Sequence, residues 1–364
     1  MTGVEVVGTA QQRAWVARVD PPVERLAAGM WSVPVPIPDN PLRYTLCYLI
    51  PGDDGLVVVD PGWETEEGWA ALEAGLAAAG ARAEDVVGIV ATHVHPDHHG
   101  LSARLAQRSG AWIGMHPAEA ATLPARGSAR PHDGAMAGWL CGCGASEQEV
   151  DELVGPGGPR PDFESMAHPD VLLEDGDALP LRGRTVRAVW TPGHTPGHLC
   201  LLEADARVML TGDHVLPRIT PNIGMTPGSD DPALETFLDS LDKIARTDEE
   251  HDGLIALPAH EYRFRGLAGR ARALQQHHAE RCAELVAIVR EAGEPTVWEV
   301  TARLTWSRPW SEVGRMRIGA LAETASHVRY LVDRGELDCD GDPVWGAAVP
   351  DETVRVRLPR RAVA

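Results

Sequence analysis

The sequence feature that most constrains the fold is a cluster of metal-binding side chains in residues 92–100. Four of them fall within six residues, in the order His-x-His-x-Asp-His, at His93, His95, Asp97 and His98. Such groups are costly to bury without partners, and together they offer the ligands that zinc, iron and manganese accept. The apolar run at residues 86–91 directly before them predicts a buried strand. The chain must therefore fold so that this strand ends at a polar site, as strands of α/β sheets do.

The composition is that of a soluble globular protein and narrows the range of partners. Of the 364 residues, 44% are hydrophobic and 24% are charged. The net charge is −20 and Lys243 is the only lysine, which argues against a broad surface for nucleic acid or membrane, although not against a local arginine patch. No apolar run reaches the length of a membrane span, and residues 1–12 do not form a secretory signal. The six cysteines show no disulfide spacing, so we expect a cytoplasmic protein.

Strand and helix signals alternate between residues 42 and 115 and predict a layered α/β fold. Apolar runs at 46–50 and 56–59 flank a Gly/Asp-rich turn and predict a hairpin. Thr65 is a suitable N-cap for a helix that ends at Gly80. Further elements are predicted at 86–91 (strand), 101–109 (helix), 111–115, 185–190, 199–203 and 207–211 (strands), 231–246 (helix) and 254–257 (strand).

Residues 118–170 interrupt this alternation and are rich in Gly, Pro and Ala. One short helix is predicted where Ser146 and Glu149 are spaced as a capping box. A long segment with little structure is either disordered or a cover over a site. We therefore expect a lid insertion, with Met136, Trp139 and Phe163 against an apolar acyl or aromatic group.

The character of the chain changes near residue 266. Helical patterns at 267–291, 296–304 and 313–334 precede a short extended tail. Three helices followed by a small hairpin suggest a mostly helical, winged-helix-like domain. We expect residues 1–265 to form the catalytic domain and residues 266–364 to form this second domain.

Three further candidate ligands follow apolar runs later in the chain. His194 follows the predicted strand at 185–190, Asp213 follows the one at 207–211, and His260 follows residues 254–257. The Gly and Pro residues beside them make tight turns that can direct each side chain. Four such motifs, each after a strand, predict one shared metal site.

With these motifs, the chain resembles the metallo-β-lactamase superfamily over roughly residues 25–265. The resemblance implies an α+β fold, a four-layer αβ/βα sandwich with a metal pair at one edge of two facing sheets. His194 in Pro-Gly-His-Thr-Pro-Gly-His and His260 in His-Glu-Tyr are most similar to the glyoxalase II branch. Asp60 in Val-Asp-Pro-Gly resembles an early Asp of the family that supports the site through hydrogen bonds without binding metal.

The resemblance also implies a ligand set and a reaction. One metal would be held by His93, His95 and His194, the other by Asp97, His98 and His260, with Asp213 bridging the two. The cofactors implied are two divalent ions, zinc first, with iron or manganese as alternatives. A hydroxide shared by the metals would attack a thioester, ester or lactone carbonyl. Asp97 would orient the water and take a proton, so Asp97 and Asp213 are the expected catalytic residues.

Residues that recognise the substrate are less defined by the sequence. Arg218, Arg263 and Arg265 lie near the motifs and are candidates for holding an anionic group of a small acyl or ester substrate, although ordinary surface arginines are equally expected. His214 adjoins the bridging Asp and can reach either metal or substrate. His99 and His198 are expected to begin helices or to support the site, and His277 and His278 to pack or lie at the surface. His116 follows a predicted strand and could line the pocket, although a structural role is the alternative.

Three other functions stay open at this point. A ribonuclease or phosphodiesterase would use the winged-helix-like domain to bind RNA through Arg303, Arg308, Arg315, Arg317 and Arg329, against which the net charge argues. A mononuclear iron redox enzyme is the second alternative, and a scaffold with a vestigial site is the third. The second domain is expected to cover the site or to pair two subunits in a homodimer.

Overall fold

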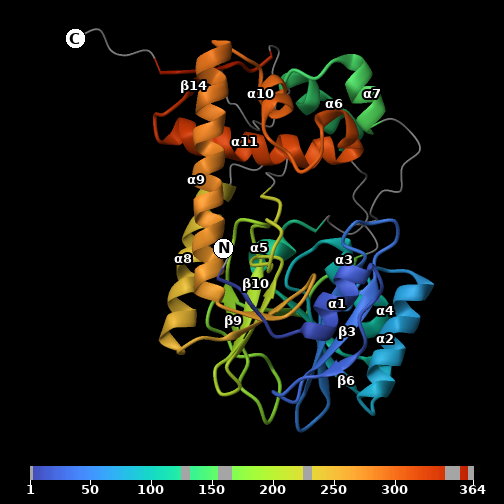
Figure 1. The fold of residues 1–364 in the computed structure, drawn as a ribbon. Helices are drawn as coiled ribbons and strands as arrows, with labels where there is room; N and C mark the ends of the chain where they lie inside the picture. The colour runs from blue at the N-terminus through green and yellow to red at the C-terminus, as the bar shows by residue number, and fades with distance from the viewer. Residues whose placement is uncertain (1–2, 124–131, 155–165, 224–231, 341–352, 360–364) are drawn as a thin grey trace. The chain divides into compact units, whose positions relative to one another are not determined.

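The computed structural model describes residues 3–123, 132–154, 166–223, 232–340 and 353–359 (Figure 1). The chain divides into two compact units, of which the first holds residues 1–127, 161–221 and 239–273, and the second holds 128–160, 222–238 and 274–364. The second unit thus takes in segments from both sides of residue 265, which a single boundary along the chain does not describe. None of the described helices is long and apolar enough to cross a membrane.

The first unit contains two mixed β-sheets. The seven-stranded sheet has the order β2 (Glu24–Arg25), β3 (Trp31–Pro36), β4 (Tyr44–Pro51), β5 (Leu56–Val59), β6 (Val86–Val90), β7 (Trp112–Met115), β8 (Val171–Leu172). The six-stranded sheet has the order β1 (Glu5–Val6), β13 (Phe264–Arg265), β12 (Ile255–Pro258), β11 (Val208–Gly212), β10 (Leu199–Glu203), β9 (Arg187–Trp190). Neighbouring strands from β5 to β8 are parallel, as are β11 and β12, and the other pairs are antiparallel.

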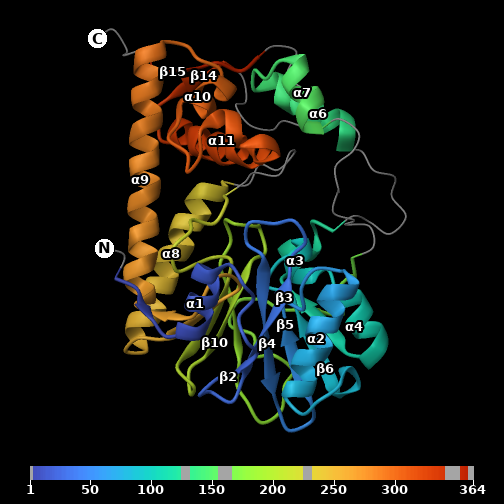
Figure 2. The same ribbon diagram turned by 45° about the vertical axis from the view of Figure 1, so that its right-hand side comes forward.

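The burial pattern of β4 shows that its sheet is covered on both faces. Leu46 and Ile50 pack in one core with residues of the other sheet, such as Leu201. Cys47 and Leu49 pack in a second core with helices α2 (Glu66–Ala78) and α4 (Ser102–Ser109), which lie against this sheet in Figure 2. Because strand side chains alternate between faces, a strand buried on both faces reads as one apolar run. Two facing sheets with helices outside form the layered sandwich that the sequence predicted.

Local signals set the ends of the helices in this unit. Thr65 Oγ1 accepts a hydrogen bond from Gly68 N at 2.9 Å, which is the N-cap predicted for α2. Gly110 closes α4 in the left-handed region, with φ 74°. Neither α1 (Thr9–Ala17) nor β3 was predicted from the residue pattern. Pro34 and Pro36 made β3 look unlike a strand, because proline is rare inside sheets. Proline is tolerated here because β2 pairs only with Trp31 and Ser32, so the rest of β3 lies at the edge of the sheet.

The second unit is mostly helical. It holds α6 (His132–Gly142), α7 (Glu147–Val154), α10 (Val297–Arg303), α11 (Arg317–Asp333), part of α8 (Ala233–Glu250) and of α9 (Leu267–Ala292), and the pair β14 (Asp338–Cys339) and β15 (Val356–Arg357). The described helices of the expected lid, α6 and α7, therefore belong to this unit. Helices followed by a two-stranded antiparallel sheet agree with the predicted content, and the winged-helix assignment stays a prediction.

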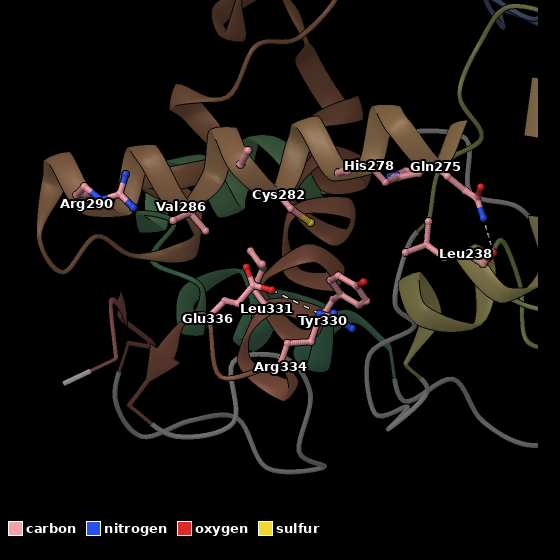
Figure 3. Close-up of a pocket in the computed structure, with 12 residues that line it drawn as sticks. Leu238, Gln275, His278, Cys282, Val286, Arg290, Tyr330, Leu331, Arg334 and Glu336 are labelled. Atoms are coloured by element: carbon pink, nitrogen blue, oxygen red, sulfur yellow. Dashed lines mark hydrogen bonds and ion pairs between the residues drawn. The ribbon is translucent and has the colours of Figure 1, made fainter. Parts of the chain in front are cut away.

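Two helices of the second unit begin with capping boxes, and the unit also contains a cavity. The capping box of α10 joins Thr296 and Glu299 through two hydrogen bonds, of 2.8 and 3.1 Å. Ser146 and Glu149 pair in the same way before α7. A cavity of about 570 Å³ lies between α9 and the end of α11, with Val286 and Leu331 in its wall (Figure 3).

Candidate metal centre

All the predicted metal ligands lie in the first unit, in segments that follow strand ends. His93, His95, Asp97 and His98 follow β6, and the last two belong to the short helix α3 (Pro96–His99). His194 follows β9, Asp213 directly follows β11, and His260 lies two residues after the end of β12. The loop after β6 is joined to the start of β10 by a hydrogen bond from Leu199 N to Thr92 O, at 2.9 Å. The two sheets therefore bring their strand ends to one edge.

The seven side chains converge there in three overlapping groups. The groups are His93, His95 and His194; His93, His98 and Asp213; and Asp97, His98 and His260, with the ligand atoms of each group within 4.8 Å of one another. In the first group, His95 Nδ1 lies 2.9 Å from His93 Nε2 and 3.2 Å from His194 Nε2. The first and third groups contain the residues that the resemblance assigned to the two metals, and this assignment stays a prediction.

Asp213 lies between the two sets. Its Oδ1 is 3.2 Å from His260 Nε2 and 3.6 Å from His98 Nε2, and its Oδ2 is 3.8 Å from His194 Nε2. The two carboxylate oxygens thus face different groups. This position supports a bridging role.

The polar atoms of the site fit a divalent cation. His98 Nε2, His260 Nε2 and Asp213 Oδ1 are buried and lack a hydrogen bond of acceptable geometry within the described parts of the chain. Buried polar atoms are normally satisfied, and here three orphaned atoms point to one place. Imidazole nitrogens and carboxylate oxygens are also the donors that zinc, iron and manganese accept.

The charge balance points the same way. Burial, with His194 nearby, lowers the pKa of His95 to about 3, so this imidazole is neutral, as a metal ligand must be. Burial would raise the pKa of Asp97, but His98 and His260 together hold it at about 2. Burial would lower the pKa of His260, yet Asp213 and Asp97 raise it to about 10. Two buried ionised carboxylates therefore draw positive charge into the site.

Hydrogen bonds from outside the site orient the ligands. Asp60, at φ 53°, accepts from Thr92 N at 2.7 Å and from His98 Nδ1 at 2.9 Å. His260 Nδ1 donates to the carbonyl of Tyr44 at 3.0 Å. Both contacts hold the proton on Nδ1 and leave Nε2 free to bind a metal, which is how metal-binding histidines are usually fixed. Asp60 thus makes the supporting contacts expected of it.

The neighbouring histidines have separate places. His198 Nε2 accepts from Asp213 N at 3.2 Å, so this imidazole supports the backbone of Asp213. His99 Nε2 donates to Ala167 O at 2.7 Å. His116 caps the short helix α5 (Pro117–Ala120) and stacks on Trp190, with ring centroids 4.8 Å apart. His214 is fully buried beside Asp213.

The candidate substrate residues show other contacts. Arg218 Nε donates to the buried carboxylate of Glu261 at 2.9 Å. Arg263 donates to Gln11 at 3.1 Å and to Glu24 at 2.6 Å. Arg265 is exposed and pairs through β13 with Glu5 of β1. Arg218 and Arg263 are therefore bound to groups of the protein itself, and a substrate role for the three arginines and for His214 stays a prediction.

The structure adds residues that sequence reasoning missed and leaves others undescribed. Glu119 is fully buried and accepts hydrogen bonds from two ligand-bearing loops, but it falls in the segment expected to lack structure. The backbone of Tyr44 was missed as well, since its contact with His260 has no sequence signature. Of the lid residues, Trp139 is buried within α6, whereas Phe163 lies outside the described residues.

The chain is similar to known proteins in both sequence and structure. The model of the Metallo-beta-lactamase superfamily matches residues 40–250. The acyl-coenzyme A thioesterase MBLAC2 of Homo sapiens is 33% identical over 127 residues, which are 35% of this chain and 40% of that protein. An atrochrysone carboxyl ACP thioesterase of Aspergillus fumigatus is 40% identical over 80 residues, 21% of this chain and 23% of that protein. The chain thus spans two fifths or less of the length of these relatives.

Two solved structures are similar over nearly their whole length. A metallo-beta-lactamase family protein from Thermus thermophilus has a TM-score of 0.70 and 29% identity, covering 91% of this chain and 98% of the other. A beta-lactamase domain protein from Burkholderia ambifaria has a TM-score of 0.73 at 22% identity, covering 98% of each chain, and shows the fold alone. With the convergent histidines and aspartates at the sheet edge, the match over residues 40–250 shows that the chain belongs to the metallo-β-lactamase superfamily.

Proposed function

We propose that this protein is a divalent-metal-dependent hydrolase that cleaves thioesters, or the related esters and lactones, of small acyl substrates. The observation that carries the proposal is the position of Asp213 between two ligand groups. We assign one metal to His93, His95 and His194 and the other to Asp97, His98 and His260, with zinc as the first candidate. The relatives named as thioesterases support the acyl class of substrate.

The ligand pattern favours the glyoxalase II type within the superfamily. An aspartate stands at position 213, where β-lactamase branches often have Cys or His, and His260 precedes Glu261-Tyr262. An aspartate at position 213 and the motif at residues 260–262 argue against antibiotic hydrolysis as the activity. The seven candidate ligands together supply two carboxylates and five imidazoles, a set able to hold two divalent ions.

The chain's own residues account for the proton transfers. Bound divalent ions supply a water of lowered pKa and polarise the substrate carbonyl. Asp97 is ionised and its side chain is 13% exposed, so it would orient that water and would take up a proton as the intermediate collapses. His260 Nε2 lies 3.4 Å from Asp97 Oδ2, so the two side chains would reach the same metal. Burial of the ligands excludes bulk water from the reacting groups.

The test combines metal analysis with a substrate panel. The full chain is purified without a His-tag or added metal, beside Asp213→Ala and the control Asp205→Ala, which changes an exposed turn residue. We expect about two zinc per chain, lost in Asp213→Ala together with hydrolysis of acyl-coenzyme A thioesters, and retained in the control. One iron per chain without hydrolysis, or cleavage of single-stranded RNA in place of thioesters, would overturn the proposal.

A further inference from the structure

Glu119 occupies an unusual place beside the three-histidine group of His93, His95 and His194. It lies in α5, which follows β7, and β7 pairs in parallel with β6, in the register Val90 to Gly114. The segments after these two strands therefore run side by side at the same sheet edge. His116 begins α5 and its Nδ1 accepts from Ala118 N at 3.1 Å, which fixes the first turn. Glu119 is thereby directed inward and is fully buried.

Its carboxylate joins two loops that are distant in sequence. One oxygen, Oε1, accepts from Val94 N at 2.7 Å, and the other, Oε2, accepts from Gly197 N at 2.9 Å. Val94 stands between His93 and His95, and Gly197 stands three residues after His194. The same side chain thus holds both segments that supply the three-histidine group.

The close approach of the second loop confirms how tightly it packs on α5. A Cβ placed on Gly197 would come within 2.2 Å of Glu119 N, so only glycine fits there. A further link between the loops, from Leu199 N to Thr92 O, lies at the strand ends. Glu119 secures the same loops beyond that point, where the imidazoles project.

We infer that Glu119 is a positioning residue, which holds the three-histidine group in the arrangement that binds its metal. The inference rests on the proposed metal-dependent function. A carboxylate can accept both N–H groups, whereas a glutamine of the same size offers one acceptor and turns an NH₂ donor towards the other N–H. The remaining ligands depend on different supports, because His98 is held by Asp60 and His260 by Tyr44. Loss of Glu119 should therefore affect one metal-binding step more than the other.

The experiment compares metal binding by full-length variants after removal of metal with a chelator. Glu119→Gln and Glu119→Asp are titrated with Co²⁺, followed by visible absorption, and with Zn²⁺, followed by calorimetry. His194→Ala identifies the step that belongs to the three-histidine group, and Glu67→Gln, exposed on α2, is the matched control. None of these measurements requires a substrate.

We expect Glu119→Gln to weaken the step that His194→Ala abolishes by about 10–100-fold, as loss of a supporting contact does, and to change its cobalt spectrum. The other step should change much less, Glu67→Gln should match the wild type, and Glu119→Asp should retain more affinity than Glu119→Gln because it keeps the charge. Wild-type binding in Glu119→Gln, or equal weakening of both steps with a lower unfolding temperature of the metal-free protein, would overturn the inference. A selective loss in a protein that hydrolyses no thioester would overturn the proposed function alone.

Discussion

Two groups of buried histidines in this protein differ in whether carboxylates lie among them. The first is the candidate metal centre at the sheet edge, and the second is the pair His278 and His327 in the helical unit. In the pair, His278 Nδ1 lies 3.1 Å from His327 Nε2, and His327 Nδ1 donates to the carbonyl of Glu323 at 2.7 Å. Burial lowers the pKa of His327 to about 4 and that of His278 well below its usual value.

The carboxylates make the difference between the two groups. At the sheet edge, Asp97 and Asp213 lie within 3.2–3.6 Å of imidazole nitrogens and bring negative charge into a buried place. In the helical unit, the chain of imidazoles ends on a backbone carbonyl and stays neutral. A buried negative charge requires a cation, whereas a neutral hydrogen-bonded pair requires none. Clustered histidines therefore indicate a metal only when the charge around them demands it.

The largest expected effect, on metal content and hydrolysis, comes from removing a negative charge from the sheet-edge group. Asp213→Asn keeps the size of the side chain and removes its charge, so we expect loss of at least one metal per chain and a fall in thioester hydrolysis of about 100-fold or more. Elemental analysis and steady-state kinetics measure the two effects. Full metal content at the full rate in this variant would show that the position of Asp213 between the groups has no bridging role.

A smaller effect is expected where a charge borders the metal centre. Arg218→Ala leaves the buried Glu261 carboxylate without its guanidinium partner, next to His260. Because the Arg218 side chain is 54% exposed, we expect a loss of only about 1–2 kcal/mol in the free energy of unfolding. Denaturant unfolding of the protein, after a chelator has removed its metal, measures this loss of stability. A variant of unchanged stability that shows a raised KM would assign Arg218 to the substrate instead.

The effect that is smallest near neutral pH concerns the protonation of the neutral pair. The pKa of His327 is about 4 in the folded state and about 6.5 when unfolded, so the unfolded chain binds the extra proton between these values. The contribution of His327 to stability is complete above about pH 6.5 and is lost as the pH falls towards 4. His327→Gln removes this proton while keeping a donor and an acceptor.

We therefore expect His327→Gln to lose less stability than the wild type on acidification, by at most about 1.4 kcal/mol per pH unit. Unfolding curves of metal-free protein at pH 7.5, 6.0 and 5.0 give the two slopes. If the wild type and His327→Gln lost stability equally with falling pH, His327 would bind protons as readily in the folded protein as in the unfolded chain. The contrast with the sheet-edge group would then fail.

Elements with a strong apolar pattern were predicted from the sequence, because the order of apolar residues along the chain indicates which of them are buried. The hairpin of β4 and β5, the helix α2 after Thr65 and the long helix α9 lie where their patterns predicted them. Helix α6 was missed because its Gly- and Ala-rich sequence has little periodicity of its own. The strand β3 was missed because the tolerance of its prolines depends on the position of β2.

The sequence by itself determined which residues are candidate metal ligands and that they follow strand ends, since both depend on local order along the chain. The tertiary structure decided what surrounds them. Glu119 reaches a loop 78 residues away, and His260 is fixed by a carbonyl 216 residues away. The predicted substrate residue Arg218 is bound to Glu261, 43 residues further along. Such contacts form only when two sheets pack face to face, because a hydrogen bond between distant residues needs both ends placed to within a fraction of an ångström.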